Sequence, residues 1–560
     1  MQWWDDLWLN EGFASWAENF AADKLFPEYS MWEQYTTGAL ATAMRLDALK
    51  SSHPIQVPIQ HAEEVEQVFD AISYCKGGSV VRMIRAVVGA KHFQTALASY
   101  MKKHAYGNTE TTDLWSALED ASGMPISQMM ASWTEQLGFP ILRITDEDWQ
   151  ADKVSLKLEQ SWFLADGSPL DEEGAAKKWT IPILTCTNAG PQSDMTLMRE
   201  KTASVSVPLS GDQAWVKLNS GQEVPLRILI TEEMLRRLAP AIQSKALSAI
   251  DRAALVNDGY ALVKAGHQSP ESLIKLLGNY KDEDSYVVWE GLSSCILGLN
   301  AVLTDCDKIS DLFKVFAKKI SLQLMAKVGW ESQASDGHLT TLLRALMITL
   351  VSTFAHDNEI VKKEAASRFK AFQENPEDVK SLPGDMRVPV FKIVLKNGGT
   401  SEYNDIKAFF FAAKSNADRA QVLRAIGHTQ DSALKQATME WATSGEVKLQ
   451  DFFYAMGSVS GSGKVGADIS WAYFQENLEK IKGMIGNASS SLMDACIVMC
   501  ASSFCSDAKA NEIEEFFASH PLPSNTRKIS QLLENMRSSA KFLKILEESG
   551  LSSESFWAEL

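Results

Sequence analysis

A change in hydrophobic period divides this 560-residue chain into three parts. Between about residues 141 and 230, apolar and polar side chains alternate, as in residues 154–158 (VSLKL). A period of two indicates strands with one buried face. Turn residues such as Gly167 and Pro169 separate the short runs. Several short strands at this spacing predict a small β-sandwich over residues 138–230.

The parts before and after this segment have helical periodicity. Residues 1–137 are rich in tryptophan and are interrupted at Pro27 and Gly107. Residues 231–560 form a succession of amphipathic segments with short breaks, such as Ser269-Pro270. The sequence shows no fixed repeat, but many helices of similar length favour a helical solenoid. We therefore predict a mainly α fold with one small all-β domain.

Composition limits the partners that such a chain can have. The net charge is −17, whereas nucleic-acid binding requires clustered Lys and Arg, so we expect no nucleic acid as partner. The same charge disfavours an acidic membrane surface. The apolar run at residues 286–303 contains Glu290 and Asn300, so we expect no membrane-spanning segment.

The cysteines indicate a reducing compartment. The chain has seven of them, an odd number, and no pair forms a CxxC motif. We also expect no signal peptide, because Asp5 and Asp6 stand where a basic and then apolar leader would be. Together these observations predict a cytoplasmic protein. Cys75 has no identifiable base beside it, so we do not expect it to act as a nucleophile.

The first residues of the chain, 3–14 (WWDDLWLNEGFA), have the pattern of a helix that begins here. Asp5 and Asp6 are expected to cap its first N–H groups. Glu11, Ser15 and Glu18 share one polar stripe, and their spacing alone favours a solvated helix face. A carboxylate enclosed by aromatic rings would instead be paired or bound to a metal ion. Aromatic side chains follow at helical spacing: Trp8, Phe13, Trp16 and Phe20.

Four blocks of the sequence resemble those of the gluzincin zinc aminopeptidases, the membrane alanyl aminopeptidase group. They are residues 3–16 (WWDDLWLNEGFASW), 69–77 (FDAISYCKG), 133–140 (WTEQLGFP) and 215–219 (WVKLN). The resemblance extends over essentially the whole chain. It implies that residues 1–137 are the C-terminal part of a thermolysin-like catalytic domain, residues 138–230 a β-sandwich, and residues 231–560 a HEAT-like α-helical solenoid.

The same resemblance assigns roles to individual residues. It implies that Glu11 is the third zinc ligand and that the Tyr74 hydroxyl stabilises the oxyanion formed during peptide hydrolysis. Glu18 either orients the metal ligands or lies on the surface. The other two zinc ligands and the general base belong to an HExxH motif, which this sequence does not contain. The family's GAMEN-type motif for the substrate amino group is also missing.

The chain therefore resembles the C-terminal portion of an aminopeptidase, beginning between the HExxH motif and Glu11. One carboxylate does not hold Zn²⁺ against water, so we expect Zn²⁺ in the complete family enzyme and neither zinc nor turnover in this chain alone. Peptides are the expected substrates, and the missing N-terminal half is a candidate partner. Two other interpretations stay open: a non-catalytic solenoid that binds peptides or proteins, and a fragment that complements a separately made N-terminal half.

Three further features have simpler explanations. His53 and His61 lie near a family loop and are expected to be capping or core histidines. Gly461-Ser462-Gly463-Lys464 is similar to a phosphate-binding loop, but a valine follows where Ser or Thr is required, so we expect a flexible loop. After Gly221-Gln222, where the family usually has aromatic residues, this chain has Glu223-Val224-Pro225. We expect the junction between sandwich and solenoid to pack differently there.

Overall fold

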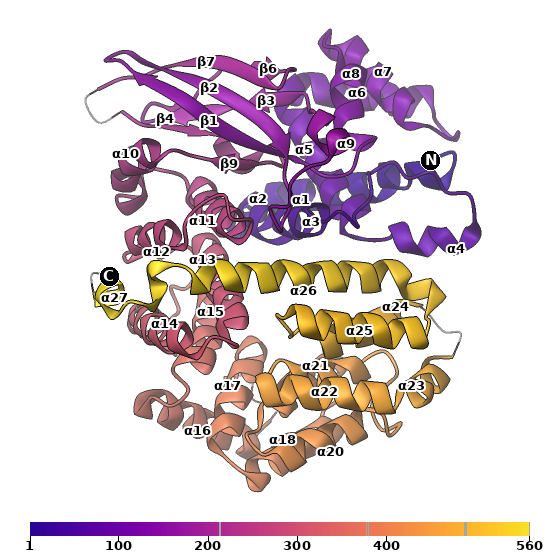
Figure 1. The fold of residues 1–560 in the computed structure, drawn as a ribbon, viewed down its shortest axis with the longest axis vertical. Coiled ribbons are helices and arrows are strands. Elements are labelled where there is room, and N and C mark those ends of the chain that lie inside the picture. The colour runs from indigo at the N-terminus through magenta and orange to yellow at the C-terminus, as the bar shows by residue number, and fades with distance from the viewer. Residues whose placement is uncertain (212–213, 377, 379, 487–489, 559–560) are drawn as a thin grey trace. The chain divides into compact units, whose positions relative to one another are not determined.

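The computed structural model describes residues 1–558 apart from 212–213, 377, 379 and 487–489 (Figure 1). The described chain forms two compact units, Met1–Cys295 and Ile296–Glu559. Helices dominate both units, and the described strands all lie in the first. The predicted fold class, mainly α with a small β part, is confirmed. The finer partition at residues 137 and 230 stays a prediction.

The first unit begins with helices that precede its strands. They are α1 (Trp8–Leu25), α2 (Met31–Tyr35), α3 (Ala41–Asp47), α4 (Ala62–Val65), α5 (Gly77–Val88), α6 (Ala90–Lys103), α7 (Thr111–Ser122) and α8 (Ile126–Thr134). The expected cap of α1 by Asp5 and Asp6 is wrong. Both residues lie in a 3-10 turn, and Leu7 takes the cap position without a side-chain hydrogen bond. Asp6 is buried and instead accepts a hydrogen bond from the first N–H of α7, at Thr111.

The strands form one four-stranded sheet and two smaller sheets. They are β1 (Pro140–Trp149), β2 (Lys153–Trp162), β3 (Ile181–Ile183), β4 (Thr185–Thr187), β5 (Gly190–Pro191), β6 (Thr196–Met198), β7 (Thr202–Pro208), β8 (Val216–Leu218) and β9 (Arg227–Leu229). The large sheet has the order β7-β2-β1-β9, with β1 antiparallel to β2 and parallel to β9. In β2, Val154, Leu156 and Leu158 are buried and alternate with more exposed residues, as the period of two predicts.

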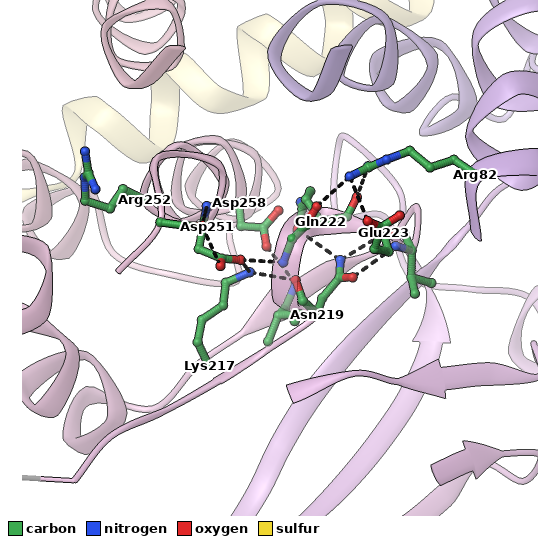
Figure 2. Close-up of polar contacts among 12 residues, drawn as sticks. Arg82, Lys217, Asn219, Gln222, Glu223, Asp251, Arg252 and Asp258 are labelled. Carbon is green, nitrogen blue, oxygen red and sulfur yellow. Dashed lines mark hydrogen bonds and ion pairs between the residues drawn. The ribbon is translucent and has the colours of Figure 1, made fainter. Parts of the chain in front are cut away.

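After its strands the first unit contains helices α10 (Glu232–Gln243), α11 (Ala249–Lys264) and α12 (Pro270–Leu277). A short helix α9 (Glu172–Ala176) lies between β2 and β3. A tight loop after β8 packs against helix α11 and is contacted by Arg82 of α5 (Figure 2). Asn219 closes this loop, since its side chain accepts from the N–H of Val224 and donates to the Val224 carbonyl. Arg82 of α5 donates to the carbonyl oxygens of Gly221 and Gln222, both at 2.8 Å.

Ion pairs hold helix α11 against strands β8 and β9, on either side of this loop. Lys217 of β8 lies 2.9 Å from Asp251 of α11, and Arg227 of β9 lies 3.0 Å from Asp258 of α11. All four side chains are buried. Figure 2 shows Lys217, Asp251 and Asp258 converging on the loop that carries Asn219. The junction is therefore a buried polar contact, in which the Nε of Arg227 is the one buried polar atom of these four side chains without a hydrogen-bond partner in the described part of the chain. The expectation that it packs differently from the gluzincin aminopeptidases stays a prediction.

Helices of the second unit pack in two layers. They are α14 (Asp307–Val328), α15 (His338–Phe354), α16 (Glu359–Glu374), α17 (Gly384–Asn397), α18 (Thr400–Ala412), α19 (Asn416–Ala425), α20 (Ser432–Ala442), α21 (Phe452–Ser460), α22 (Lys464–Glu476), α23 (Leu478–Ile485), α24 (Ser490–Ala501), α25 (Asp507–Ser519), α26 (Thr526–Glu547) and α27 (Glu554–Ala558). Helices α15, α17, α19, α21, α24 and α26 each pack against the next in that series. Helices α14, α16, α18, α20, α22 and α25 each pack on a member of it. This is the arrangement of a helical solenoid.

The chain passes from the first unit to the second within helix α13 (Tyr286–Leu303). By length and composition this helix could cross a membrane, although it contains Glu290 and Asn300. The expectation that the chain has no membrane-spanning segment stays a prediction. However, 61% of the helix is buried inside the protein, as in the core helices of folded domains. Helices α15 and α16 pass the same test only when taken together, and they are bent by 119°.

Candidate functional site

Glu11 lies in the first turn of α1, and residues around it fix that helix. Trp8 is fully buried, and its Nε1 donates to the Thr111 hydroxyl at 3.0 Å. That hydroxyl donates in turn to Asp6 at 2.6 Å. Glu11 itself is partly exposed and Glu18 is exposed, so the polar stripe predicted from their spacing faces solvent.

Two glycines bring α1 against α5. A Cβ atom on Gly12 would lie 2.9 Å from the carbonyl carbon of Gly77 and 3.0 Å from its Cα. A Cβ atom on Gly77 would lie 3.1 Å from the Cα of Gly12. The two backbones are therefore in direct contact, which only glycine allows. Because Gly77 directly follows the turn that carries Tyr74, this contact also sets the separation between Glu11 and Tyr74.

Tyr74 lies in a π-helical turn (Ile72–Lys76) that continues into α5. Such turns depart from the regular helical hydrogen-bond pattern and often occur at functional sites. Tyr35 and Ser79 both donate to the Cys75 carbonyl oxygen, at 3.1 and 2.7 Å. Burial raises the pKa of Tyr35, so its hydroxyl stays a donor at neutral pH. The backbone on the C-terminal side of Tyr74 is thus held from α2.

A buried histidine holds the other side of the turn. His53 has its Nε2 3.0 Å from Asp70 and its Nδ1 2.7 Å from the Pro54 carbonyl oxygen. Asp70 also accepts from the N–H of Ile72 at 2.8 Å. Both ring nitrogens of His53 are occupied, which confirms that it is a structural histidine. His61 takes the N-cap position of α4, which is also as predicted.

Lys76 attaches the turn to the sequence block that precedes β1. Its amino group is buried and lies 2.8 Å from Asp47, which is also buried. The same amino group donates to the Gly138 carbonyl at 3.0 Å, and the Gly138 N–H donates to Asp47. Lys76 and Asp47 are each other's buried counter-ion, so removing either side chain would leave the other as an unpaired buried charge.

Glu11 and Tyr74 interact directly. The pKa of Tyr74 is raised, first by partial burial, then by the negative charge of Glu11 and by a hydrogen bond to it. The phenol therefore stays protonated at neutral pH and can donate its proton in a hydrogen bond. Burial and the charges of Asp70 and Glu18 raise the pKa of Cys75, which keeps the neighbouring thiol neutral and poorly nucleophilic.

The residues at this site do not by themselves make a zinc centre. A catalytic zinc ion takes three protein ligands and a water molecule. Glu11 supplies one carboxylate, and within the part of the chain that the structure describes no group of three His, Cys, Asp or Glu side chains could hold a metal ion. What the arrangement offers chemically is a carboxylate beside a protonated phenol, both reachable from solvent.

Sequence reasoning missed the residues that position this pair. Neither the Gly12–Gly77 contact nor the Lys76–Asp47 ion pair was predicted, although both lie in or beside the recognised blocks. Glycines in both blocks were the available signal, because a glycine in a helix costs stability unless something approaches it closely. Tyr35 carried no signal of its own, since a buried tyrosine is common in helical cores.

Two family descriptions match the beginning and the later part of the chain, and known relatives match nearly all of it. Residues 1–133 match the description "Peptidase family M1 domain", and residues 215–538 match "ERAP1-like C-terminal domain". The chain is 34% identical over 557 residues to Aminopeptidase M1-B of Oryza sativa subsp. japonica, covering 97% of this chain and 62% of that protein. It is 33% identical over 565 residues to Aminopeptidase M1 of Arabidopsis thaliana, covering 98% and 62%.

A nematode relative gives the same result. The chain is 30% identical over 558 residues to Puromycin-sensitive aminopeptidase of Caenorhabditis elegans, covering 97% of this chain and 57% of that protein. The chain thus spans about three fifths of the length of these curated relatives. Since the two family descriptions together account for most of its residues, the chain belongs to the M1 family of aminopeptidases.

Proposed function

We propose that this chain forms part of the active site of a zinc aminopeptidase, which hydrolyses N-terminal residues from peptides. In this proposal the Tyr74 hydroxyl donates to the oxyanion that develops on the attacked carbonyl group. Glu11 is a zinc ligand that acts together with ligands outside this sequence. The observation that carries the proposal is the Gly12–Gly77 contact, which brings the Glu11 carboxylate beside the Tyr74 hydroxyl. Membership of the M1 family supports the same reaction class.

The test supplies what the chain lacks. The segment of the Arabidopsis thaliana relative that precedes its match to this chain is fused before residue 1. We expect the fusion to hydrolyse alanyl and leucyl amides, and the chain alone to show no turnover and no stoichiometric zinc by mass spectrometry.

Variants of the fusion then test the two roles. Tyr74→Phe should lower kcat by about 10²–10³-fold with little change in KM, since one oxyanion donor is lost. Glu11→Gln should lower zinc content. Tyr106→Phe, on a fully exposed tyrosine, is the matched control and should leave kcat unchanged.

Two results would contradict the proposal. One is a bound zinc with turnover in the chain alone, because the chain would then hold a complete site elsewhere. The other is a Tyr74→Phe fusion as active as its parent. A fusion that binds peptides without cleaving them would favour the alternative, a non-catalytic peptide-binding solenoid.

The proposal also includes a reducing, cytoplasmic location. All seven cysteines are free thiols, and Cys186, Cys295, Cys496, Cys500 and Cys505 are buried. One yeast relative carries the name "Aminopeptidase 2, mitochondrial", so the location of this chain is to be tested by fractionation.

A further inference from the structure

The second unit contains a cavity with a basic wall. Its volume is about 1170 Å³. It is lined by residues of α13, α14, α15, α17, α21, α22 and α25 and of the turn after α19. Lys392 and Lys396 stand one turn apart on α17 at this wall, and His428 follows α19. Lys435 of α20 lies behind them and donates to the hydroxyl of Ser462, a lining residue, at 2.7 Å. We call Lys392, Lys396, His428 and Lys435 the basic cluster.

The basic cluster carries charge that nothing in the described part of the chain neutralises. Lys396 donates to the Ser352 carbonyl at 2.8 Å, and Lys435 to the Gly427 carbonyl at 3.2 Å. Neither amino group, nor that of Lys392, forms an ion pair with a described residue. Carbonyl and hydroxyl oxygens solvate a buried ammonium group but do not cancel its charge.

Burial and neighbouring positive charges both act on groups of the basic cluster. Burial, Lys392 and Lys435 lower the pKa of Lys396 to about 8, and burial lowers that of Lys435 to about 8. Burial and the three lysines hold the pKa of His428 well below its usual range. His428 is 8% exposed, and its Nδ1 is buried without a hydrogen-bond partner among the described residues. No carboxylate contributes to any of these shifts.

Two of the three acidic residues in the described lining pair with lysines outside the basic cluster. Asp357 pairs with Lys318 at 2.8 Å, and Asp305 pairs with Lys464 at 3.2 Å. Asp468 is the remaining acidic residue among the described lining. The positive field at α17 is therefore open to a ligand from solvent.

Hydroxyl groups and a helix start face the same space. Residues 461–463, expected to be a flexible loop, are the short connection between α21 and α22. Helix α22 begins after Gly463 without a side-chain cap, so its first N–H groups lack a side-chain partner. Five serines also line the cavity: Ser460, Ser462, Ser502, Ser503 and Ser506.

This lining distinguishes between classes of anion. Planar carboxylates pair best with the fork of an arginine, and no arginine is found among the described residues that line the cavity. Lysine binds phosphate as a point charge, and tetrahedral phosphate oxygens accept from several hydroxyl and N–H donors at once. We propose that the basic cluster and the start of α22 bind a small phosphate-bearing anion. This site lies outside the Glu11–Tyr74 pair and does not depend on the proposed peptidase activity.

Pyrophosphate is the anion for the test, with citrate as the carboxylate of comparable charge. Binding to the purified chain is measured by calorimetry at constant ionic strength. We expect saturable pyrophosphate binding, weaker citrate binding, and a higher Tm with pyrophosphate. Lys392→Gln with Lys396→Gln should weaken pyrophosphate binding by at least about tenfold, because two charge-assisted contacts are lost.

Control variants distinguish binding at the basic cluster from non-specific attraction of anions to surface lysines. Lys319→Gln with Lys370→Gln removes the same charge from exposed positions outside the cavity and should leave binding unchanged. Lys392→Met alone serves if the double variant does not fold, and should also weaken binding. The proposal is overturned if the wild-type chain shows no saturable pyrophosphate binding, if the cavity variants bind as tightly as wild type, or if citrate binds as tightly as pyrophosphate.

Discussion

Replacing Gly12 by alanine should push α1 away from α5 and weaken both the fold and the site. The added Cβ would lie 2.9 Å and 3.0 Å from two backbone atoms of Gly77, which cannot rotate away as a side chain can. Carbon atoms pack at about 3.5–4.0 Å, so the two helices must separate by roughly 0.5–1 Å. Overpacking of this kind costs about 1–3 kcal/mol in the free energy of unfolding.

Thermal unfolding of the purified chain measures this cost. At about 2 °C per kcal/mol for a unit of this size, the Tm of the first unit should fall by about 2–6 °C. Gly38→Ala is the matched control, because no atom lies within 4 Å of its added Cβ. Alanine favours a helix over glycine by up to about 1 kcal/mol, so Gly38→Ala should keep or raise the Tm.

The reasoning fails if Gly12→Ala has a Tm as high as Gly38→Ala. That result would mean that α1 and α5 can adjust without strain, and that the glycine contact does not set the Glu11–Tyr74 separation. In the active fusion, a displacement near 1 Å should also lower activity by about 10²-fold, although neither Glu11 nor Tyr74 is changed.

Three further changes test other parts of the structure. Lys76→Ala should lower the free energy of unfolding by about 3–5 kcal/mol in urea denaturation, because it leaves Asp47 buried and unpaired, whereas Lys76→Met with Asp47→Leu should cost less. Asn219→Ala should cost about 1–3 kcal/mol, since Asn219 has a φ of 55° and closes its loop through its side chain, and Asn219→Gly should recover part of the loss. The pKa of Lys396 is lowered to about 8, so between pH 8 and its ordinary value of 10.5 the unfolded chain binds more protons than the folded chain. Wild type should therefore gain stability relative to Lys396→Met as pH rises through this window, and a constant difference between the two melting curves would contradict the shift.

Local patterns in the sequence predicted the fold class, and they named Glu11 and Tyr74 as candidate site residues, which stay predictions. The alternation at Val154, Leu156 and Leu158 appears as strand β2. In a strand, every second side chain lies on the same face, so only one arrangement buries all three apolar residues. Glu11 and Tyr74 were identified from the sequence blocks that contain them, residues 3–16 and 69–77. Their proximity was not derivable from spacing, because they lie 63 positions apart in the chain.

Where sequence reasoning failed, the missing information was a distant partner. Asp6 looks like a cap of the helix that follows it, but its carboxylate binds the start of α7 at Thr111. A capping preference describes what a side chain can bind and not which helix it will meet. The basic cluster was not predicted for the same reason, because Lys396 and Lys435 belong to different helices and become neighbours only in the folded solenoid.

Helix α1, which carries Glu11, is positioned by contacts made by its neighbouring residues. Helix α1 is anchored by Trp8, Thr111 and the Gly12–Gly77 contact, none of which involves the Glu11 side chain. Because Glu11 is partly exposed, its charge is solvated and needs no buried counter-ion. This differs from domains in which metal binding supplies the folding energy.

Glu11→Gln should therefore leave the Tm of the chain unchanged, within about 0.5 kcal/mol of stability. Gly12→Ala, one residue away, should lower it by several degrees. If Glu11→Gln destabilised the chain as much as Gly12→Ala, the carboxylate would be a structural residue and its assignment as a preformed ligand would be wrong. We expect equal melting curves for wild type and Glu11→Gln, with loss of zinc only in the fusion. That result would mean that Glu11 contributes to zinc binding and not to the stability of helix α1.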